Sequence, residues 1–562
     1  MDYTKLKKEF DAAKARRSNF DNMYQVIGEY VAMNRQDFTG EPSNGEFLVD
    51  RIFDATGAAA AKIASSALLG MLWPGSAGNS FELAPVGDDD EVNEEEKTFF
   101  IKLNKQVYAA FDDPRANLAA SLDAYMYDQI VFGTSGVGTE DGEKSDLFFS
   151  PYSVKEIYPI TGKGGVVIGF WVHFQWSVER IVGEYGLENC GKVIQDAYKG
   201  GKTDEMFPIL FCVKKRDKQE AEKGQKAMPY QGHHLSYKDC HLLKEDGFWE
   251  LPIAVGRWTK LSYEEMGRSP AMDALPDIRE ANVLREALIV ATEKILDMPK
   301  GVMSDGDFGG GTMDFSAGAI NVFNSNGTMT GNPVFDIGSP PNIPWAEKRL
   351  EQLRESISQH FNIDRLLDLN NSTEMTLGEA QIRDQAKVAS LSALFNRQIQ
   401  VLQQVIERGV SLLFRSGKLG VVRGSDEEAT LVREGGTPKY LPDSIAKKLA
   451  EGKDIYKVNY KTRAALAYSA EQYRAMLEVQ GFAASQAQIN PNYVKRINEK
   501  KFLDELCRIR GISFMLKTDE EYEATQAAEQ QQMQQQQGLA AGEQLATIAE
   551  KAANAEARVK GQ

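Results

Sequence analysis

The chain has 562 residues, a length that exceeds a single compact core and therefore predicts several domains. A hydrophobic content of 42% is sufficient for packed interiors and excludes a chain that is disordered throughout. Its 65 Lys and Arg residues and 81 Asp and Glu residues give a net charge of −16, which argues against a protein that wraps nucleic acid through dense phosphate contacts.

Residues 1–33 predict a long amphipathic helix. Such a helix packs on its own domain or contacts another subunit, and the sequence leaves both interpretations open. The start of the chain, MDYTKLKKEFDAAKARRSNF, is charged throughout, so it is no signal peptide and we expect a protein made in the cytosol. Arg17 interrupts the apolar row, whose members are spaced by three and four: Leu6, Phe10, Ala13, Phe20, Tyr24, Ile27 and Val31.

Residues 55–73 resemble a membrane-spanning segment in length and in carrying only one charged residue, Lys62. Most of them are Ala, Gly and Ser, which are weakly apolar, and Pro74-Gly75 ends the segment as a soluble helix ends. We therefore predict a small-residue helix packed against its neighbours and no membrane segment.

Residues 147–258 differ in character from the helical segments before them. Short runs rich in Val, Ile, Phe and Trp lie between Gly and charged turns: GVVIGFWVHFQW, MFPILFCVKK and FWELPIAVGRW. This pattern predicts β-strands, so residues 1–268 are expected to contain a β-rich part.

Two helices are predicted on either side of a small β-containing segment. Ser269 is an N-cap candidate, and Pro270 occupies the first helical position, where Pro is tolerated. A Gly-rich stretch with strand-like pieces follows at 298–342, before the second helix at 343–361. The apolar stripe of the first helix is Leu284, Leu288, Ala291 and Ile295, and that of the second is Leu350, Leu353 and Ile357.

A polar loop at 362–375 precedes a very long helix. Thr376 and Glu379 form a T-x-x-E capping box, which indicates a helix start. Helical apolar spacing then continues to Phe414 without Pro. At 1.5 Å per residue this helix is roughly 55 Å long, whereas globular helices average about three turns.

Residues 519–562 are rich in Ala and Gln, a composition that is often disordered. A row of residues spaced by three and four nevertheless resembles the narrow seam of a coiled coil: Leu545, Ile548, Ala552, Ala555 and Val559. The segment is too short and too polar to form a stable helix alone. Disorder and a helical bundle with other copies both remain open.

No catalytic, cofactor-binding or metal-binding constellation can be assembled. KGGKT ends like a phosphate-binding loop, but Asp196 stands where that loop requires Gly and would repel phosphate. GTSGVG lacks the second Gly of the nucleophile elbow because Val137 occupies its place. The acidic run at 87–96 indicates a solvated linker or a helix start, and four scattered cysteines fit no disulfide framework. The remaining metal-ligand candidates match no standard zinc spacing: Cys212, His233, His234, Cys240 and His241.

Three signatures resemble the head-to-tail connecting, or portal, proteins of short-tailed bacteriophages. The first, ASSALLGMLWPGSAGNSFEL, is a small-residue helix followed by a Leu-x-Pro-Gly turn and an aromatic-x-Leu strand. The second, VGRWTKLSYEEMGRSPAMDALPDI, is similar to the family's R-W…G-E-x-Y-G-R-S-P segment, which opens a stem helix. The third, EMTLGEAQIRD, resembles the family's M-T-A-x-E motif, with Leu377 and Gly378 in place of the usual small residues.

The resemblance implies an α+β, mainly α subunit with wing, stem, clip and crown regions and a helical C-terminal barrel or tail, assembled as a ring of twelve copies. The long helix would then carry the chain from the channel wall to the periphery of the ring. The implied regions are the wing with its β-rich part at 1–268, the first stem helix at 269–297, the clip at 298–342, the second stem helix at 343–361, the tunnel loop at 362–375, the long wing helix at 376–416, the wing and crown at 417–518 and the tail or barrel helix at 519–562.

The tunnel loop is implied to project into the central channel. A ring around DNA must let a polyanion slide, and dense Lys and Arg would trap it through phosphate contacts. An acidic chain with a few polar donors would keep these contacts brief. The candidates are Arg365, Asn370, Asn371 and Ser372, with Thr376 and Glu379 as the helix cap after the loop; alternatively, Arg365 pairs with Asp364 or Asp368 on the surface.

The interpretation is therefore a structural virion protein at the portal vertex, without enzymatic activity or cofactor. Double-stranded DNA would pass through it non-specifically during packaging and ejection. The implied partners are the terminase large subunit, the major capsid and scaffolding proteins, and the tail adaptor and nozzle proteins, with assembly in the host bacterial cytoplasm and no membrane contact. The alternatives are a scaffold or internal core protein, or an enzyme such as a packaging ATPase or a metal-dependent hydrolase.

Overall fold

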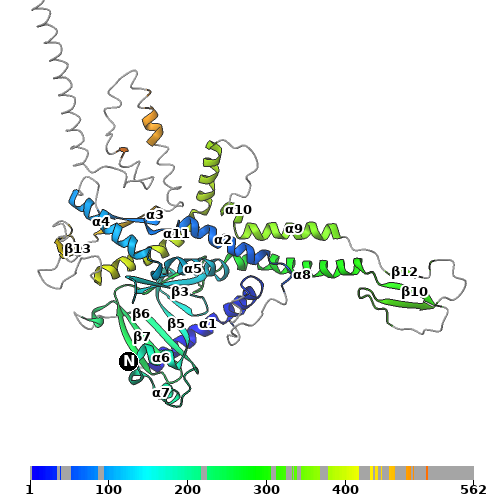
Figure 1. The fold of residues 1–562 in the computed structure, drawn as a ribbon, viewed down its shortest axis with the longest axis horizontal. Coiled ribbons are helices and arrows are strands. Elements are labelled where there is room, and N and C mark those ends of the chain that lie inside the picture. The colour runs from blue at the N-terminus through cyan, green and yellow to red at the C-terminus, as the bar shows by residue number, and fades with distance from the viewer. Residues whose placement is uncertain are drawn as a thin grey trace, which may run out of the picture. The chain divides into compact units, whose positions relative to one another are not determined.

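A computed structural model gives the fold of the chain in two compact units, residues 1–465 and residues 466–562 (Figure 1). The small unit is described at 476–482, 485, 502 and 503, where 476–482 is helical. The description of the large unit covers 3–33, 38, 52–86, 94–216, 224–261, 263–304, 312–324, 332, 334–337, 343–366, 377–416, 431–434, 437–440, 445, 448 and 455–461.

Helices dominate the first part of the large unit. The predicted N-terminal helix is confirmed as α1 (Tyr3–Tyr30), and the small-residue helix as α2 (Thr56–Leu72). Short α3 (Ala77–Ser80), α4 (Glu94–Phe111) and α5 (Leu118–Phe132) follow. The end of the acidic run thus begins α4, one of the two interpretations given above. Within the described residues, no helix is both long enough and apolar enough to cross a membrane.

Two antiparallel sheets confirm the predicted β-rich part. Three strands, β3 (Leu147–Tyr152), β2 (Thr134–Asp141) and β9 (Ile253–Arg257), pair in that order. The second sheet follows chain order: β4 (Ile157–Thr161), β5 (Val167–Ser177), β6 (Met206–Lys215), β7 (Tyr230–Ser236) and β8 (Leu242–Phe248). Between β5 and β6, α6 (Val178–Tyr185) and α7 (Lys192–Lys199) bury Ile181 and Ile194 against Phe207.

Two further strand pairs and several short turns complete the large unit. β1 (Phe81–Pro85) pairs with β15 (Tyr456–Tyr460), which lies late in the sequence, and β13 (Leu431–Glu434) pairs with β14 (Thr437–Tyr440). The 3-10 helices are Pro114–Ala116, Lys163–Gly165, Leu187–Asn189 and Gln225–Ala227.

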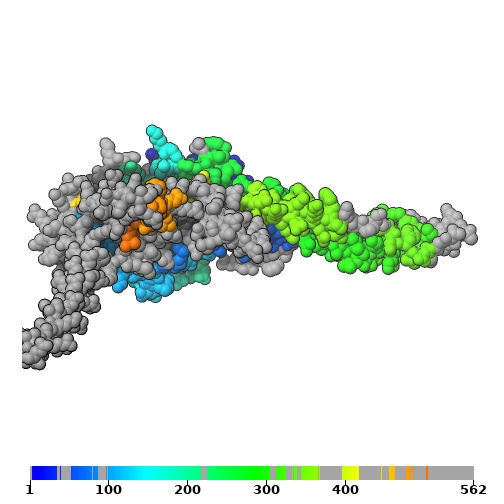
Figure 2. Space-filling model, turned by 90° about the horizontal axis from the view of Figure 1, so that it is seen from above, coloured from blue at the N-terminus to red at the C-terminus, as the bar shows by residue number. Residues whose placement is uncertain are grey.

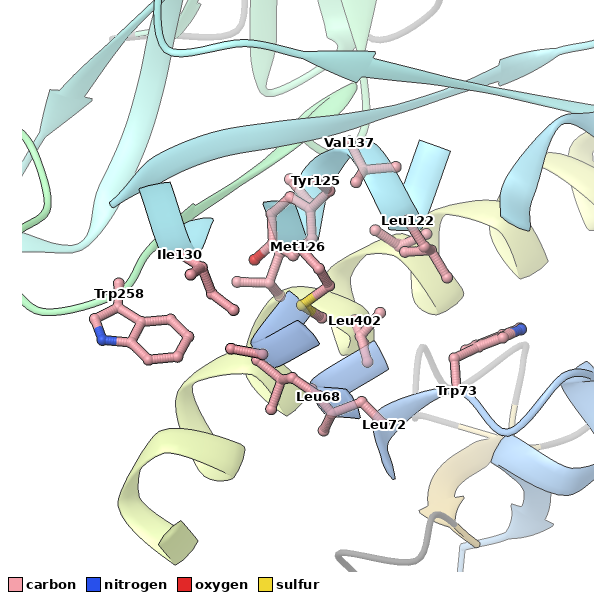
Figure 3. Close-up of a cluster of buried hydrophobic side chains, with 14 of the residues drawn as sticks. Leu68, Leu72, Trp73, Leu122, Tyr125, Met126, Ile130, Val137, Trp258 and Leu402 are labelled. Carbon is pink, nitrogen blue, oxygen red and sulfur yellow. The ribbon is translucent and has the colours of Figure 1, made fainter. Parts of the chain in front are cut away.

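The largest hydrophobic cluster lies where α2, α5 and the long helix α11 (Leu377–Arg415) meet the three-stranded sheet (Figure 3). Leu68 of α2, Met126 of α5 and Leu402 of α11 are each at most 2% exposed and lie together in this cluster. The small residues of α2 allow this close approach, because Ala60, Ala61 and Ala64 are also buried there. The packing thus agrees with the prediction of a small-residue helix held between neighbours.

Helix α1 packs on two parts of its own domain. Leu6 and Phe10 lie against the five-stranded sheet, where Phe10 contacts Trp171 with a ring-centroid distance of 5.7 Å. Tyr24 and Ile27, about four turns further along α1, belong to the large hydrophobic cluster. The apolar row of α1 is therefore covered by the chain itself, the first of the two interpretations.

Arg17 lies at the junction between these two contacts and is itself buried. Its Nη1 donates to the carbonyl oxygens of Val154 and Ile157 at 2.7 and 3.4 Å. Its guanidinium also pairs with Asp21 at 2.8 Å and lies over the ring of Tyr158. The break in the apolar row is thus a cation that binds the backbone beside edge strand β4.

Candidate functional site

The region predicted to carry the function contains two long antiparallel helices, α8 (Pro270–Leu296) and α9 (Ile343–His360). Glu280 pairs with Arg349 at 2.8 Å, and Asp277 accepts a hydrogen bond from Ser356 at 2.6 Å. Lower residue numbers on α8 therefore lie beside higher numbers on α9, so the two helices run in opposite directions. Figures 1 and 2 show that this pair projects from the rest of the large unit.

The start of α8 is fixed by the predicted cap. The Ser269 hydroxyl accepts a hydrogen bond from the Met272 amide at 3.1 Å and donates one to the Val131 carbonyl at 2.7 Å. Pro270 occupies the first helical position, as expected. Because Ser269 is buried and Val131 lies at the end of α5, this cap also ties α8 to the core.

The second signature contributes Gly267 to a tight contact with Gly133, which follows α5. Gly133 has a φ of +79° after α5, and a Cβ on it would lie 2.7 Å from the Gly267 carbonyl oxygen. A Cβ on Gly267 would in turn lie 2.1 Å from the Gly133 oxygen. The amide of Gly267 donates to Thr134 Oγ1 at 2.7 Å, and that of Trp258 donates to the Gly133 carbonyl at 2.9 Å. The residues before Ser269 therefore hold the start of α8 in contact with the turn between α5 and β2.

The inner face of the helix pair is apolar, as the sequence predicted. Leu288 of α8 and Leu350, Leu353 and Ile357 of α9 are buried. The other members of the predicted α8 stripe are partly buried: Leu284, Ala291 and Ile295. At the base, Asn282 Oδ1 accepts a hydrogen bond from the Phe53 amide at 2.7 Å, which joins α8 to the residues before α2. The pair is thus packed along its inner face and anchored to the core at one end.

The helix pair carries exposed apolar side chains on its outer face. Val283 is 61% exposed and Val290 44%, and Leu296 at the end of α8 is 82% exposed. Single exposed apolar residues are ordinary on protein surfaces, but several along one projecting element indicate an interaction surface.

A small sheet lies at the far end of the helix pair (Figure 1). It contains β10 (Lys300–Ser304), β11 (Ile320–Asn324) and β12 (Val334–Asp336) in the order β11-β10-β12. β11 runs parallel to β10, and β12 runs antiparallel to it. The two strand-like pieces predicted within 298–342 are β11 and β12.

The segment between α9 and α11 is anchored at its beginning. Asn362 has a φ of +55° directly after α9 and turns the chain into α10 (Ile363–Leu366). Phe361, Ile363 and Leu366 are buried in the large cluster. The segment therefore starts from a fixed point in the core.

The candidate DNA-contact residues are mostly outside the described residues. Arg365 is the third residue of α10, and Glu379 is the third residue of α11. Helix α11 begins at Leu377, as the capping box predicts. The other DNA-contact candidates, Asn370, Asn371 and Ser372, lie outside the described residues, as does the predicted cap residue Thr376.

The second half of α11 is embedded in the core. Val405, Ile406 and Val410 are buried beside a buried cation, Arg408. The Nε of Arg408 donates to the Thr139 carbonyl at 2.8 Å, and its Nη1 lies 3.6 Å from a Glu250 carboxylate oxygen. Burial lowers the pKa of Arg408 to about 10, a value at which the side chain stays charged at neutral pH. Helix α11 thus joins the segment after α9 to the three-stranded sheet.

The described residues contain no group of three or more His, Cys, Asp or Glu side chains arranged to hold a metal ion. Neighbouring His233 and His234 on β7 point to opposite faces of the sheet, as adjacent strand residues do. His234 contacts Tyr185 at 2.9 Å, and burial lowers the pKa of His233. KGGKT ends α7 in a turn in which Gly201 has a φ of +74°, in agreement with the prediction that this sequence is a turn.

Sequence reasoning did not foresee the partners of Arg17, which it noted only as a break in an apolar row, and it missed the positioning roles of Asp54 and Arg408. The signal for Arg17 and Arg408 was present, since each interrupts an apolar row at helical spacing. Their partners could not be named from sequence, because Arg408 and Thr139 are 269 residues apart.

Comparisons with known proteins agree with this arrangement. A sequence profile of the family described as "Bacteriophage head to tail connecting protein" matches residues 3–515. The chain is 20% identical over 554 residues to the portal protein of Salmonella phage epsilon15, covering 96% of this chain and 94% of that protein. It is 22% identical over 409 residues to the "Probable portal protein" of Bordetella phage BPP-1, covering 70% of this chain and 71% of that protein. The profile match includes the helix pair, the small sheet and α11.

Proposed function

This chain belongs to the bacteriophage head-to-tail connecting protein family, the portal proteins, and from this premise we propose how its parts form the portal. The general function of the family is to provide the passage at a capsid vertex through which DNA is packaged and later ejected. That function places the chain in the virion as a structural component.

We assign each part of the chain to a region of a portal subunit. The exposed, anchored helix pair supports a stem, and the small sheet at its far end supports a clip. The assignments are the wing with its β-rich part at 1–268, the stem helices at 269–297 and 343–361, the clip at 298–342, the tunnel loop at 362–375, the long wing helix at 376–416, the wing and crown at 417–518 and the tail or barrel helix at 519–562.

The exposed apolar outer face of the helix pair is the observation that carries this proposal. Val283 is 61% exposed and Val290 44% on α8, which projects from the core. Further copies of the chain, side by side around an axis, would cover them and form a closed ring. The proposed ring has twelve copies.

The tunnel loop is proposed to contact DNA in the channel. It starts from the buried anchor at Phe361 and Ile363 and leads into α11, which lies in the core from Phe395 onwards. A loop whose start is fixed in the core is suited to mechanical contact with a sliding duplex. Brief contacts suit a chain with a net charge of −16, because its 81 acidic residues outnumber its 65 basic ones and oppose tight phosphate binding.

The proposed partners follow from the position of a portal in the virion. They are the terminase large subunit during packaging, the major capsid and scaffolding proteins during assembly in the host cytoplasm, and the tail adaptor and nozzle proteins afterwards. Energy for DNA movement would come from the terminase.

Negative-stain images of the purified chain test the proposed ring. The expected particles are closed rings with a central hole. Dispersed subunits or open filaments at every protein concentration would contradict the proposal and favour a scaffold or internal core protein. ATP hydrolysis by the purified chain, or one bound zinc per chain, would instead favour an enzyme.

A further inference from the structure

The turn between β4 and β5 and the loop before α8 bring positively charged side chains together. Lys260 Nζ donates hydrogen bonds to the carbonyl oxygens of Gly164 and Gly165 at 2.9 and 3.3 Å. The Arg257 guanidinium donates to the same Gly165 oxygen through Nη2, and to the Glu265 carbonyl through Nη1 at 3.3 Å. Two cations therefore share one acceptor and lie close to each other.

Two further cations extend this group. Arg397, an exposed residue of α11, donates from Nη1 to the Trp258 carbonyl at 2.5 Å and to Thr259 Oγ1 at 3.1 Å. Thr259 directly precedes Lys260 in the loop, and Lys163 is exposed in the turn that Lys260 contacts. We call these four side chains the basic cluster: Lys163, Arg257, Lys260 and Arg397.

Among the residues that the structure describes, no carboxylate pairs with the basic cluster. The hydrogen-bond acceptors of its members are backbone carbonyls and one hydroxyl, which are neutral. The neighbouring carboxylates of Glu264 and Glu265 pair instead with Arg268 and Arg16, at 2.6 and 3.1 Å. Burial lowers the pKa of Arg257, the direction expected for a partly buried cation without an opposite charge beside it.

This arrangement favours a bound anion. Like charges held close together repel each other, and an anion between them would remove the repulsion. Lys163, Lys260 and Arg397 are exposed, so an anion can reach them in the folded chain. Tyr263, which is 82% exposed in the same loop, adds a hydroxyl donor. Lys and Arg side chains and tyrosine hydroxyls are among the groups that contact the phosphates of nucleic acids.

We propose that the basic cluster, together with Tyr263, binds the phosphate backbone of double-stranded DNA. The general function of the family brings DNA to this chain. The contact would not depend on base sequence, because phosphates carry no sequence information directly. It is a second DNA contact, additional to the proposed tunnel loop at 362–375 and independent of where that loop lies.

Variants that remove charge from exposed members of the basic cluster test the proposal. Lys163→Gln combined with Lys260→Gln removes two charges and leaves polar side chains in place. Lys192→Gln combined with Lys199→Gln on α7 is the matched control, because both lysines are exposed and lie outside the basic cluster. The affinity of the purified full-length chain for a short labelled duplex is measured by fluorescence anisotropy over a range of salt concentrations. Circular dichroism shows whether each variant folds.

The salt dependence gives the number of phosphate contacts. If all four cations contact phosphates, they contribute roughly −3 to −4 to the slope of the logarithm of the binding constant against the logarithm of salt concentration. Each lysine removed should reduce the magnitude of the slope by about 1, so the cluster variant should lose about 2 and the control variant nothing. At low salt the affinity of the cluster variant should fall about tenfold or more.

The same comparison is repeated in a chain that lacks residues 370–372. The difference between the cluster variant and its control should persist there, because it does not involve the proposed tunnel loop. A difference that disappears in this background would assign the lost binding to the tunnel loop and overturn the proposal.

Two other outcomes would also overturn it. One is the same slope and affinity in the cluster variant and the control variant, and the other is a wild-type chain that does not bind DNA at low salt. Labelled polyglutamate serves as a second probe in the same assay. Binding of polyglutamate without binding of DNA would replace the DNA contact with a contact to an acidic protein.

Discussion

Arg354 of α9 donates two hydrogen bonds to Oδ2 of Asp54, which lies 300 residues earlier in the chain, at 3.0 and 2.7 Å. The carboxylate is only 2% exposed, whereas the Arg354 side chain is 46% exposed. Oδ1 of the same carboxylate accepts from the Thr56 amide at 2.9 Å, just inside α2. One buried charge therefore connects the start of α2 to α9 in the helix pair.

Replacing Arg354 with Ala should destabilise the subunit, because it removes two charge-assisted hydrogen bonds from a buried carboxylate. The expected loss is about 1.5–3 kcal/mol. Arg349→Ala is the matched control, since its partner Glu280 is 48% exposed, and exposed pairs contribute about 0–1 kcal/mol. Denaturant unfolding at matched protein concentration measures both. Equal losses in the two variants would show that the buried pair has no special role.

The same pair predicts a dependence of stability on acid. Burial alone would raise the pKa of Asp54, but hydrogen bonds from Thr56 and Arg354 outweigh it and hold the pKa below 3.8. A carboxyl group whose pKa is lower in the folded than in the unfolded state stabilises the fold at pH values above its unfolded-state pKa. This stabilisation is lost as the pH falls through the folded-state pKa. The stability difference between wild type and Asp54→Asn should therefore be constant near neutral pH and shrink below about pH 4. A difference that grows on acidification would contradict this sign.

Arg17→Ala should loosen the junction between the five-stranded sheet and the main core. It would leave the carbonyls of Val154 and Ile157 without this donor and Asp21 without its counter-charge. The expected cost is about 3 kcal/mol or more. Arg16→Ala is the neighbouring control, because Arg16 is 57% exposed and pairs with Glu265 on the surface. Thermal unfolding should separate the variants; similar midpoints would show that Arg17 is dispensable for folding.

Two Asp substitutions on α8 should separate folding from assembly. Leu288→Asp places a charge in the buried inner face and should destabilise the subunit itself. Val283→Asp changes a position that is 61% exposed, so the subunit should fold normally but ring formation should weaken. Circular dichroism reports folding, and size-exclusion chromatography reports assembly. Unchanged rings in Val283→Asp would place the subunit contact on another face.

Deletion of residues 370–372 should impair packaging or retention of DNA and leave ring assembly nearly normal. Loop residues without buried apolar contacts contribute little to stability, whereas a channel loop acts on DNA directly. A Gly-Ser-Gly replacement of the same length separates loss of contacts from loss of loop length. DNA content of assembled particles is the measurement. A deletion that abolishes rings, or one with fully normal packaging and retention, would place this loop away from the channel.

Local chemistry in the sequence predicted the main elements. Ser269 and Pro270 define the start of α8, and the capping box indicates the start of α11 at Leu377. The three and four spacing of apolar residues gave α1 and its buried face. These features depend on residues within one or two turns of each other, so spacing alone reveals them. The prediction of the function came from the family resemblance, because no catalytic motif in the sequence indicated it.

The tertiary structure decided the relationships between distant residues. Spacing marks Arg17 as a break in an apolar row, but its binding to the Val154 carbonyl appears only once β4 lies beside α1. The contact between Gly133 and Gly267, and the pairing of Asp54 with Arg354, likewise join segments far apart in sequence. Such contacts form because hydrophobic packing brings whole elements together, and a buried charge or a close backbone approach then requires one particular partner. A single sequence carries no local signal for that partner.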